Sequence, residues 1–170
     1  TLNSGINGTN SGHVRIFEYN ETEGTWMQVG SDIDGEAAED GSGTRVTLSD
    51  DGNRIAISAI YNDGNFTDNL SNTGHARVFE FDNVTEEWYQ IGQDIDGSFQ
   101  QDVFGQDLSI SGQGDRVAGA SRFSGYVIVY DYNLQSNAWH QVGQTLYGDP
   151  LSEYYGTYVD LNKDGNRLVV

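Results

Sequence analysis

The sequence contains no cysteine, so disulfide bonds and thiolate chemistry are excluded. It has a single proline against 22 glycines, which indicates many tight turns that form without the fixed backbone angle of proline. No stretch approaches the roughly 20 apolar residues that a membrane-spanning helix needs. We therefore expect no membrane insertion.

Positive charge is also scarce. The 170 residues include 8 Lys and Arg but 26 Asp and Glu, which gives a formal net charge of −18. Nucleic acids and anionic membrane surfaces bind through positive patches, so we expect neither as a partner. The 10 Tyr, 7 Phe and 3 Trp supply the large apolar side chains of a packed core. The composition therefore indicates a folded chain and not a disordered acidic segment.

Three short patterns recur along the chain. One reads Gly-His-Val-Arg-Ile-Phe-Glu-Tyr at 12–19 and returns in related form at 74–81 and 125–132. A Trp-x-Gln segment followed by Val or Ile and then Gly occurs at 26–30, 88–92 and 139–143. A third pattern starts at Gly43, Gly105 and Gly156. In every pattern the copies are 62 and 51 positions apart, so an insertion of 11 residues lies within 61–73.

A repeat of 51 residues is close to the length of one blade of a β-propeller, which has four strands in about 40–50 residues. Apolar residues fall on both faces of the repeated strands, as they do in a sheet that is covered on both sides by neighbouring sheets. The predicted fold class is therefore all-β, with tandem four-stranded antiparallel blades. We expect a partial propeller whose parent has roughly six to eight blades.

The repeat also divides the chain. We expect residues 1–11 to be a tail or linker and residues 12–35 to form a half blade with third and fourth strands. Whole blades are predicted at 43–97, with the insertion at 61–73, and at 105–148, followed by a half blade with first and second strands at 156–170. The chain starts at Thr1 and stops within an apolar run, so we expect it to be part of a longer protein. Further blades of that parent, or other protein chains, would cover the open sheet edges.

Six aromatic residues recur in register with the repeat. Because aromatic side chains fill the space between stacked sheets, they are predicted to pack blades together. These residues are Trp26, Trp88, Trp139, Phe17, Phe79 and Tyr130. The alternative for the tryptophans is a platform for stacking sugars.

Paired carboxylates form a candidate metal site. Asp32 and Asp34 precede a glycine, and Asp94 and Asp96 do the same one repeat later. Alternating carboxylates of this kind can gather oxygen ligands around calcium, although the plainer interpretation is a solvated strand end with a turn. The third copy has no carboxylate at these positions. No other cofactor is expected.

Five Asn-x-Ser/Thr sequons fall where the repeat predicts loops, the insertion or the tail. Such loops can carry N-linked glycans in secreted proteins, although Asn and Thr also favour turns. The sequon residues are Asn7, Asn20, Asn65, Asn69 and Asn83. They indicate an extracellular or cell-surface glycoprotein.

One stretch carries a family resemblance. Val103-Phe104-Gly105, followed by Leu108-Ser109-Ile110 and by Arg116 to Ala120, resembles the FG-GAP repeat of integrin-α-type propellers. Residues 51–56, Asp-Gly-Asn-Arg-Ile-Ala, are similar to the turn of TolB-type propeller repeats. The first resemblance implies adhesion or scaffolding outside the cell. The calcium loop of many FG-GAP repeats is not matched, because the turns between the first two strands are short and vary in their carboxylates.

Residues able to carry chemistry recur, or are replaced, in register with the repeat. His13 and His75 are equivalent, and His140 stands where the other copies have Met27 and Tyr89. No phosphate-binding glycine loop or nucleophile elbow is present. The sequence therefore predicts no catalytic residue and no enzymatic activity. It favours a structural or adhesive extracellular protein that binds other proteins in an assembly, with a carbohydrate-binding propeller and the propeller domain of a secreted enzyme as alternatives.

Overall fold

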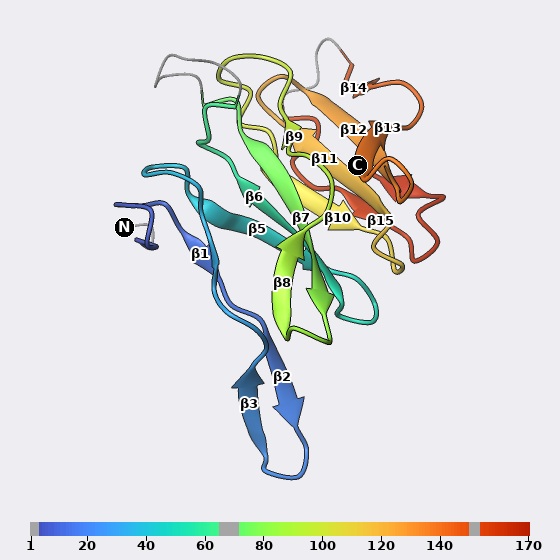
Figure 1. Cartoon of the computed structure of the whole chain (residues 1–170). Coiled ribbons are helices and arrows are strands. Elements are labelled where there is room, and N and C mark those ends of the chain that lie inside the picture. The colour runs from blue at the N-terminus through green and yellow to red at the C-terminus, as the bar shows by residue number, and fades with distance from the viewer. Residues whose placement is uncertain (1–3, 65–71, 150–153) are drawn as a thin grey trace.

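A computed structural model describes residues 4–64, 72–149 and 154–170 (Figure 1). Within these residues the chain forms strands and turns without a helix, and so without a helix long and apolar enough to cross a bilayer. The strands are β1 (His13–Val14), β2 (Phe17–Asn20), β3 (Thr25–Gln28), β4 (Ile33–Asp34), β5 (Ser42–Leu48), β6 (Arg54–Ala59), β7 (His75–Asp82), β8 (Glu87–Gln90), β9 (Ile95–Asp96), β10 (Asp107–Ile110), β11 (Arg116–Ser121), β12 (Tyr126–Asn133), β13 (Ala138–Gln141), β14 (Leu146–Tyr147), β15 (Asp160–Leu161) and β16 (Leu168–Val169).

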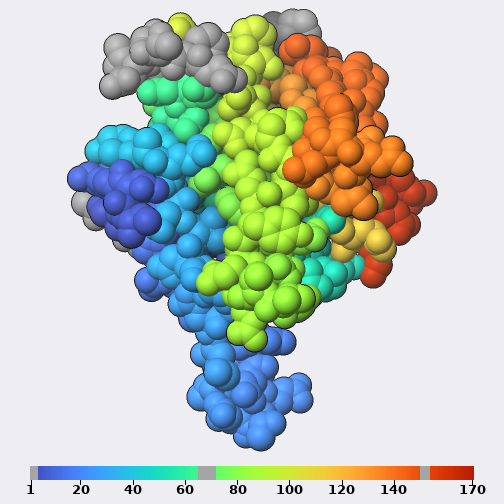
Figure 2. All heavy atoms as spheres, in the orientation of Figure 1, coloured from blue at the N-terminus to red at the C-terminus, as the bar shows by residue number. Residues whose placement is uncertain are grey.

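Two antiparallel sheets follow one another along the chain. Strands β5, β6, β7 and β8 pair in chain order, and so do β10, β11, β12 and β13. In each sheet a further two-residue strand, β9 or β14, pairs with the start of the third strand. Three two-stranded sheets accompany them: β1–β4 and β2–β3 come before them along the chain, and β15–β16 comes after. Figure 2 shows the β2–β3 hairpin projecting from the body. The predicted all-β class with tandem four-stranded antiparallel units is confirmed, and the short extra strand is an addition to it.

The core lies between the sheets. Strand β6 is buried along nearly its whole length, which requires cover on both of its faces. One cluster joins residues of the two large sheets, among them Val78 from β7 and Val117 from β11. Phe104 is fully buried in the same cluster, and its ring occupies the space that a Cβ atom on Gly119 would need. Glycine in the second strand therefore admits the large Phe104 side chain, which comes from the segment just before the first strand of the same sheet.

The fourth strands are joined by tryptophan. The indole N–H of Trp88 donates to the carbonyl of Val29, and that of Trp139 donates to the carbonyl of Ile91, both at 2.9 Å. Each ring lies against the glycine that follows this carbonyl, because a Cβ atom on Gly92 would lie 2.6 Å from Cδ1 of Trp139. We call this arrangement, an indole on the carbonyl and glycine of the preceding fourth strand, the tryptophan joint.

The aromatic residues predicted to pack blades lie in different surroundings. Trp139 is 3% exposed and Phe79 is buried, while Trp88 and Tyr130 are half-buried and pack against the core clusters. Trp26 is 67% exposed and Phe17 is 48% exposed on the β2–β3 sheet. The difference follows the sheets, because β2–β3 has a neighbour on one side only within the described residues.

The tryptophan joint can be tested at its glycine. Gly92 and Gly125 have similar positive φ angles, 71° and 66°, but a Cβ atom on Gly125 would meet nothing within 4 Å. Both Gly92→Ala and Gly125→Ala therefore incur similar backbone strain, and only Gly92→Ala also displaces Trp139. We expect Gly92→Ala to lower the free energy of unfolding by about 1–3 kcal/mol more than Gly125→Ala does, measured by urea denaturation. Equal losses would contradict the joint.

Candidate functional site

A polar pocket lies where β5, β10 and β15 begin, which are the first strands of three successive sheets. Its volume is about 270 Å³, and it is lined by Thr44, Arg45, Ile60, Gln106, Arg122, Thr157 and Tyr158. Thr44 and Arg45 belong to β5, while the other polar lining residues lie just before β10 or β15 or just after β11. These side chains meet because β10 contacts both β5 and β15. We call this cavity the inner-strand pocket.

Two guanidinium groups give the pocket its chemistry. Arg45 Nε donates to the carbonyl of Gln106 at 2.9 Å and lies 3.2 Å from Asp107 Oδ1, which fixes the group at the wall. Asp107 is itself held, because its Oδ2 accepts the backbone N–H of Val159 at 2.7 Å. Arg122 stacks on the rings of Phe123 and Tyr154, with Cζ 5.0 and 5.7 Å from the ring centres.

The Nε atom of Arg122 has an unusual position. It is buried, and among the described residues it has no hydrogen-bond partner. An unpaired buried donor is unfavourable, by about 1–3 kcal/mol, unless a ligand or water completes it.

The pocket therefore offers cationic groups together with three hydroxyls. Those of Thr44 and Thr157 donate to the carbonyls of Gly41 and Tyr154, so they remain as acceptors for hydroxyl groups of a ligand, and the Tyr158 hydroxyl also lines the pocket. The set suits an anionic and hydroxylated ligand.

The lining residues occupy equivalent places in the repeat but differ in type. Arg45 corresponds to Asp107 and Tyr158, and Ile60 corresponds to Arg122. Sequence reasoning missed this pocket because it searched for residues that recur. The available signal was the opposite one, namely positions where the repeat holds its spacing while the side chain changes between a cation, an anion and an aromatic.

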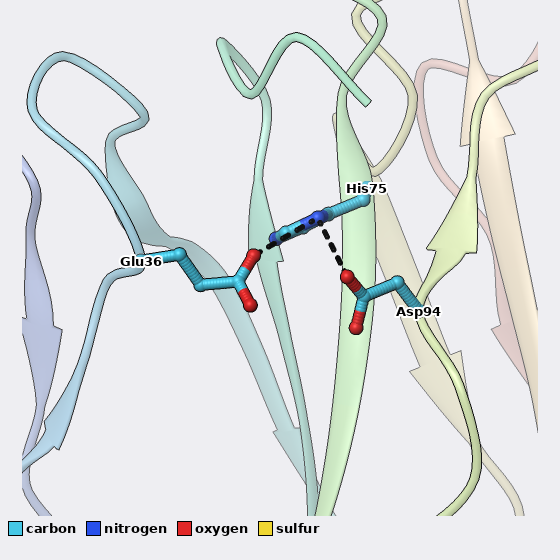
Figure 3. A group of neighbouring side chains, drawn as sticks. All are labelled: Glu36, His75 and Asp94. Carbon is cyan, nitrogen blue, oxygen red and sulfur yellow. Dashed lines mark ion pairs between the residues drawn. The ribbon is translucent and has the colours of Figure 1, made fainter. Parts of the chain in front are cut away.

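A second cluster lies between the sheet β5–β8 and the loop that follows β4 (Figure 3). His75 starts β7, Asp94 precedes β9, and Glu36 comes from the loop between β4 and β5. The imidazole Nδ1 atom lies 3.8 Å from both Glu36 Oε2 and Asp94 Oδ2. Arg77 supports the group, since its Nη2 donates to the carbonyl of Asp34 at 2.9 Å and its Nη1 lies 3.5 Å from Glu36 Oε1.

Burial sets the charges in this cluster. It lowers the pKa of His75 to about 4, so the imidazole is neutral at pH 7 and the 3.8 Å contacts are not ion pairs there. Burial also raises the pKa of Glu36 and of Asp96 above the usual range of a carboxyl group. The cluster therefore combines a neutral imidazole with the Glu36 carboxylate, which takes up a proton more readily than an exposed one.

Glu36, His75 and Asp94 could hold a divalent cation. Their ligand atoms all lie within 4.8 Å of one another. Two ligands on opposite sides of a cation with bonds of about 2.1–2.4 Å are about 4–5 Å apart, so the spacing fits. A neutral imidazole is also the form of histidine that binds metals.

The four carboxylates that the sequence predicted as candidate calcium ligands lie in different surroundings in the structure. Asp94 joins His75 and Glu36, whereas Asp32 receives two hydrogen bonds from the Nε atom of Arg15, both at 2.9 Å. The Arg15 guanidinium lowers the pKa of Asp32 to about 2. Asp34 and Asp96 lie in the short strands β4 and β9, opposite His13 and His75.

The sequon residues are also placed. Asn20 and Asn83 lie at the β2–β3 and β7–β8 hairpins, where the Asn20 side chain accepts the backbone N–H groups of Thr22 and Glu23. Asn7 is exposed and donates to the carbonyl of Gly35 at 2.7 Å. Asn65 and Asn69 lie outside the described residues.

The fold defines part of a β-propeller, and solved structures of such proteins match it. One is a proposed 6-phosphogluconolactonase from Bacteroides uniformis ATCC 8492, with a TM-score of 0.58, 19% identity, and coverage of 84% of this chain and 36% of that chain. A second, a proposed 6-phosphogluconolactonase from Bacteroides fragilis NCTC 9343, has a TM-score of 0.57, 15% identity and coverage of 84% and 35%. The periplasmic gluconolactonase of Pseudomonas aeruginosa has a TM-score of 0.52, 17% identity and coverage of 87% and 36%.

These similarities show the fold, because identities of this size do not carry an activity. The chain spans about a third of the length of the matched structures, between 35% and 36%. Comparisons with protein-family models and with curated proteins find no match.

The resemblance to FG-GAP integrin repeats is corrected by this comparison, since the matched propellers are of the gluconolactonase kind. The motif has a packing cause instead. Phe104 is buried against Gly119, and Gly105 has a φ of 85° that favours glycine. Phe-Gly at this place therefore follows from sheet stacking and does not mark one family.

The predictions of a non-enzymatic adhesive or structural protein and of no enzymatic activity are corrected by the same finding, because the three matched propellers named above bear enzyme names. The physical reason for the error is the argument from recurrence. It covered histidine and tryptophan positions, but the side chains of the inner-strand pocket do not recur, so it could not exclude a site there.

The neutral state of His75 predicts a pH dependence. Between the ordinary pKa of 6.5 and the folded value of about 4, the unfolded chain binds more protons than the folded chain. The free energy of unfolding therefore falls as pH drops through this window, by about 2 kcal/mol at pH 5. We expect urea denaturation to show a larger loss between pH 7 and pH 5 in the native sequence than in His75→Gln. The same loss in both proteins would contradict a neutral His75.

The cation-binding geometry predicts a ligand effect on stability. We expect Mn²⁺ to raise the midpoint temperature of unfolding of the native sequence at pH 7. Binding to the folded state alone adds about 2.7 kcal/mol to the free energy of unfolding when the ion is at 100 times its Kd. Asp94→Asn and His75→Gln remove one ligand each and should abolish the rise. Asp149→Asn, which removes an exposed carboxylate elsewhere, should retain it. A rise that survives Asp94→Asn would place the cation at another site.

Proposed function

We propose that this chain is part of a propeller that hydrolyses the cyclic ester of an anionic sugar lactone, and that the inner-strand pocket binds this substrate. The observation that carries the proposal is the pair of arginines, Arg45 and Arg122, in one hydroxyl-lined pocket of a chain whose formal net charge is −18. A positive pocket within so acidic a chain attracts a small anion in preference to other surfaces. The names of the matched propellers support a sugar lactone as that anion.

The hydrolysis needs a group that stabilises negative charge. Water adds to the ester carbonyl carbon and loses a proton, and the carbonyl oxygen becomes an oxyanion. The bond to the ring oxygen then breaks, and this oxygen takes up a proton to give a hydroxyl and a free acid. A preorganised donor aimed at the oxyanion lowers the barrier to such a reaction. Arg122 suits this role, since its guanidinium lines the pocket and is held in place by stacking on the rings of Phe123 and Tyr154.

Arg45 suits a different role. Its side chain is 47% exposed, and its Nε is already engaged by Gln106 and Asp107. The remaining N–H groups of this half-exposed side chain can hold a phosphate or carboxylate of the substrate in a bidentate way. Such binding is equally strong before and during the reaction, so it affects KM more than kcat.

The experiment follows hydrolysis of 6-phosphogluconolactone above the uncatalysed rate. We expect Arg122→Met to lower kcat/KM by about 100-fold or more, as loss of one oxyanion donor does. Arg45→Met should mainly raise KM. Lys163→Met is the control, because it removes one positive charge from an exposed side chain outside the pocket. An equal loss in Lys163→Met, or no hydrolysis by the native sequence, would contradict the proposal.

A further inference from the structure

Hydrolysis of a lactone in the inner-strand pocket involves two proton transfers that neither arginine performs. The adding water loses a proton, and the ring oxygen gains one when its bond to carbon breaks. A guanidinium group is not deprotonated in proteins, so Arg45 and Arg122 supply positive charge and hydrogen bonds only. Efficient hydrolysis therefore needs a further group in the pocket that accepts one proton and releases another.

The side chains that most often move protons in enzymes are absent from the described lining of the pocket. No histidine, aspartate or glutamate belongs to it. Asp107 is the carboxylate at its wall, and both oxygens are engaged: Oδ1 lies 3.2 Å from Arg45 Nε, and Oδ2 accepts the backbone N–H of Val159 at 2.7 Å. These contacts use the carboxylate to hold the wall together.

Three hydroxyl groups remain, and two of them have committed their proton to a carbonyl. Thr44 Oγ1 donates to Gly41 at 2.7 Å, and Thr157 Oγ1 donates to Tyr154 at 2.6 Å. An aliphatic hydroxyl is also a much weaker acid than a phenol. Among the described lining residues, the Tyr158 hydroxyl is therefore the group suited to exchange a proton with a ligand.

Other tyrosine hydroxyls of the chain serve the fold. Three of them donate their proton to an acceptor side chain, in the pairs Tyr89–Glu80, Tyr126–Asp102 and Tyr132–Asn137. The Tyr158 hydroxyl forms no such pair with a described residue and lines the pocket instead. Its proton is therefore available to a bound molecule.

The backbone on both sides of Tyr158 is held in place. The N–H of Thr157 donates to the carbonyl of Tyr154 at 3.2 Å, and the N–H of Val159 donates to Asp107. The Tyr158 side chain is 73% exposed, so its ring stands at the rim of the pocket and not in the core. A fixed backbone with a polar tip at the pocket is the arrangement that brings a proton-transfer group to its substrate.

We propose that the Tyr158 hydroxyl relays the proton in this hydrolysis, an inference that rests on the function proposed for the pocket. The phenol oxygen takes the proton that the adding water loses, and the phenol proton passes to the ring oxygen as the ring carbon–oxygen bond breaks. One proton enters the side chain and one leaves it, so the tyrosine is unchanged after each turnover. The two guanidinium groups of the pocket stabilise negative charge that develops on the phenol oxygen during the exchange.

A tyrosine at the rim of a sugar site has a second available role, as a platform on which the ligand stacks. The two roles use different parts of the side chain, since stacking needs the ring and the relay needs the hydroxyl. Tyr158→Phe removes the hydroxyl and keeps the ring. This single substitution therefore separates the two roles.

The test measures kcat and KM for hydrolysis of 6-phosphogluconolactone. We expect Tyr158→Phe to lower kcat by about 100-fold or more, as loss of a general acid–base group does, with little change in KM. Because the side chain is exposed, urea denaturation should give the same free energy of unfolding as for the native sequence. Tyr147→Phe is the matched control, since it removes a hydroxyl from a side chain that is 64% exposed outside the pocket, and it should leave kcat unchanged.

Tyr158→His supplies a readout that a purely structural role would not change. An imidazole exchanges protons, so this variant should recover part of the kcat lost in Tyr158→Phe. Its kcat should also vary with pH around the ordinary imidazole pKa of about 6.5, as the native kcat does not.

The outcomes separate this inference from the function on which it rests. Hydrolysis by the native sequence with an unchanged kcat in Tyr158→Phe would overturn the relay and leave the proposed function standing. A change confined to KM, or an equal fall of kcat in Tyr147→Phe, would also overturn the relay. No hydrolysis by the native sequence would contradict the proposed function itself, and the relay with it.

Discussion

The structure depends on one recurring constraint: each sheet is covered on both faces only where it has a neighbour on each side. The tryptophan joint shows how this is achieved. A large ring from one fourth strand needs a glycine in the preceding one, and its polar N–H needs a carbonyl at the same place. Packing and hydrogen bonding therefore fix the same register, and a shift of one residue would lose both.

Much of the fold was accessible from the sequence for this reason. The spacing of Trp, Gly and Arg across the copies reflects contacts that every unit repeats, so it revealed the strands and their order. The short strands β9 and β14 were not foreseen, because pairing of two residues beside the third strand leaves little pattern. The exposure of Trp26 was also not foreseen, since a repeat alone does not distinguish an inner copy from an outer one.

The candidate sites were far less accessible. Glu36 lies 39 positions before His75 in the sequence and meets it only because the loop after β4 packs on the next sheet. The inner-strand pocket draws on three units at once, and Arg45 and Arg122 stand where other copies have an acid, a tyrosine or an isoleucine. Such differences look like imperfect repetition until the fold brings them together. Of the four predicted calcium ligands, Asp94 lies in this cluster, and the sequence analysis paired it with neither His75 nor Glu36.

The buried carboxylate Asp102 illustrates how one place in the repeat can hold different chemistry. It accepts a hydrogen bond from the hydroxyl of Tyr126 and another from that of Ser121. The equivalent of Tyr126 in the preceding unit is His75, and that of Asp102 is Asp40, which bonds instead to Asn62. The framework accommodates either set, because the same strand pairing and the same tryptophan joint are present in both units.

Stacked units that contact only their neighbours have a further property. Their stability is close to a sum of intrinsic and nearest-neighbour contributions, so it varies along the array. The side chains of the sheet β2–β3 are mostly exposed, so this sheet gains little stability from contact with a neighbour. Opening at this hairpin needs little of the cooperative unfolding that the sheet β5–β8 requires. Local opening is therefore expected to differ from sheet to sheet, according to how many neighbouring sheets each one contacts.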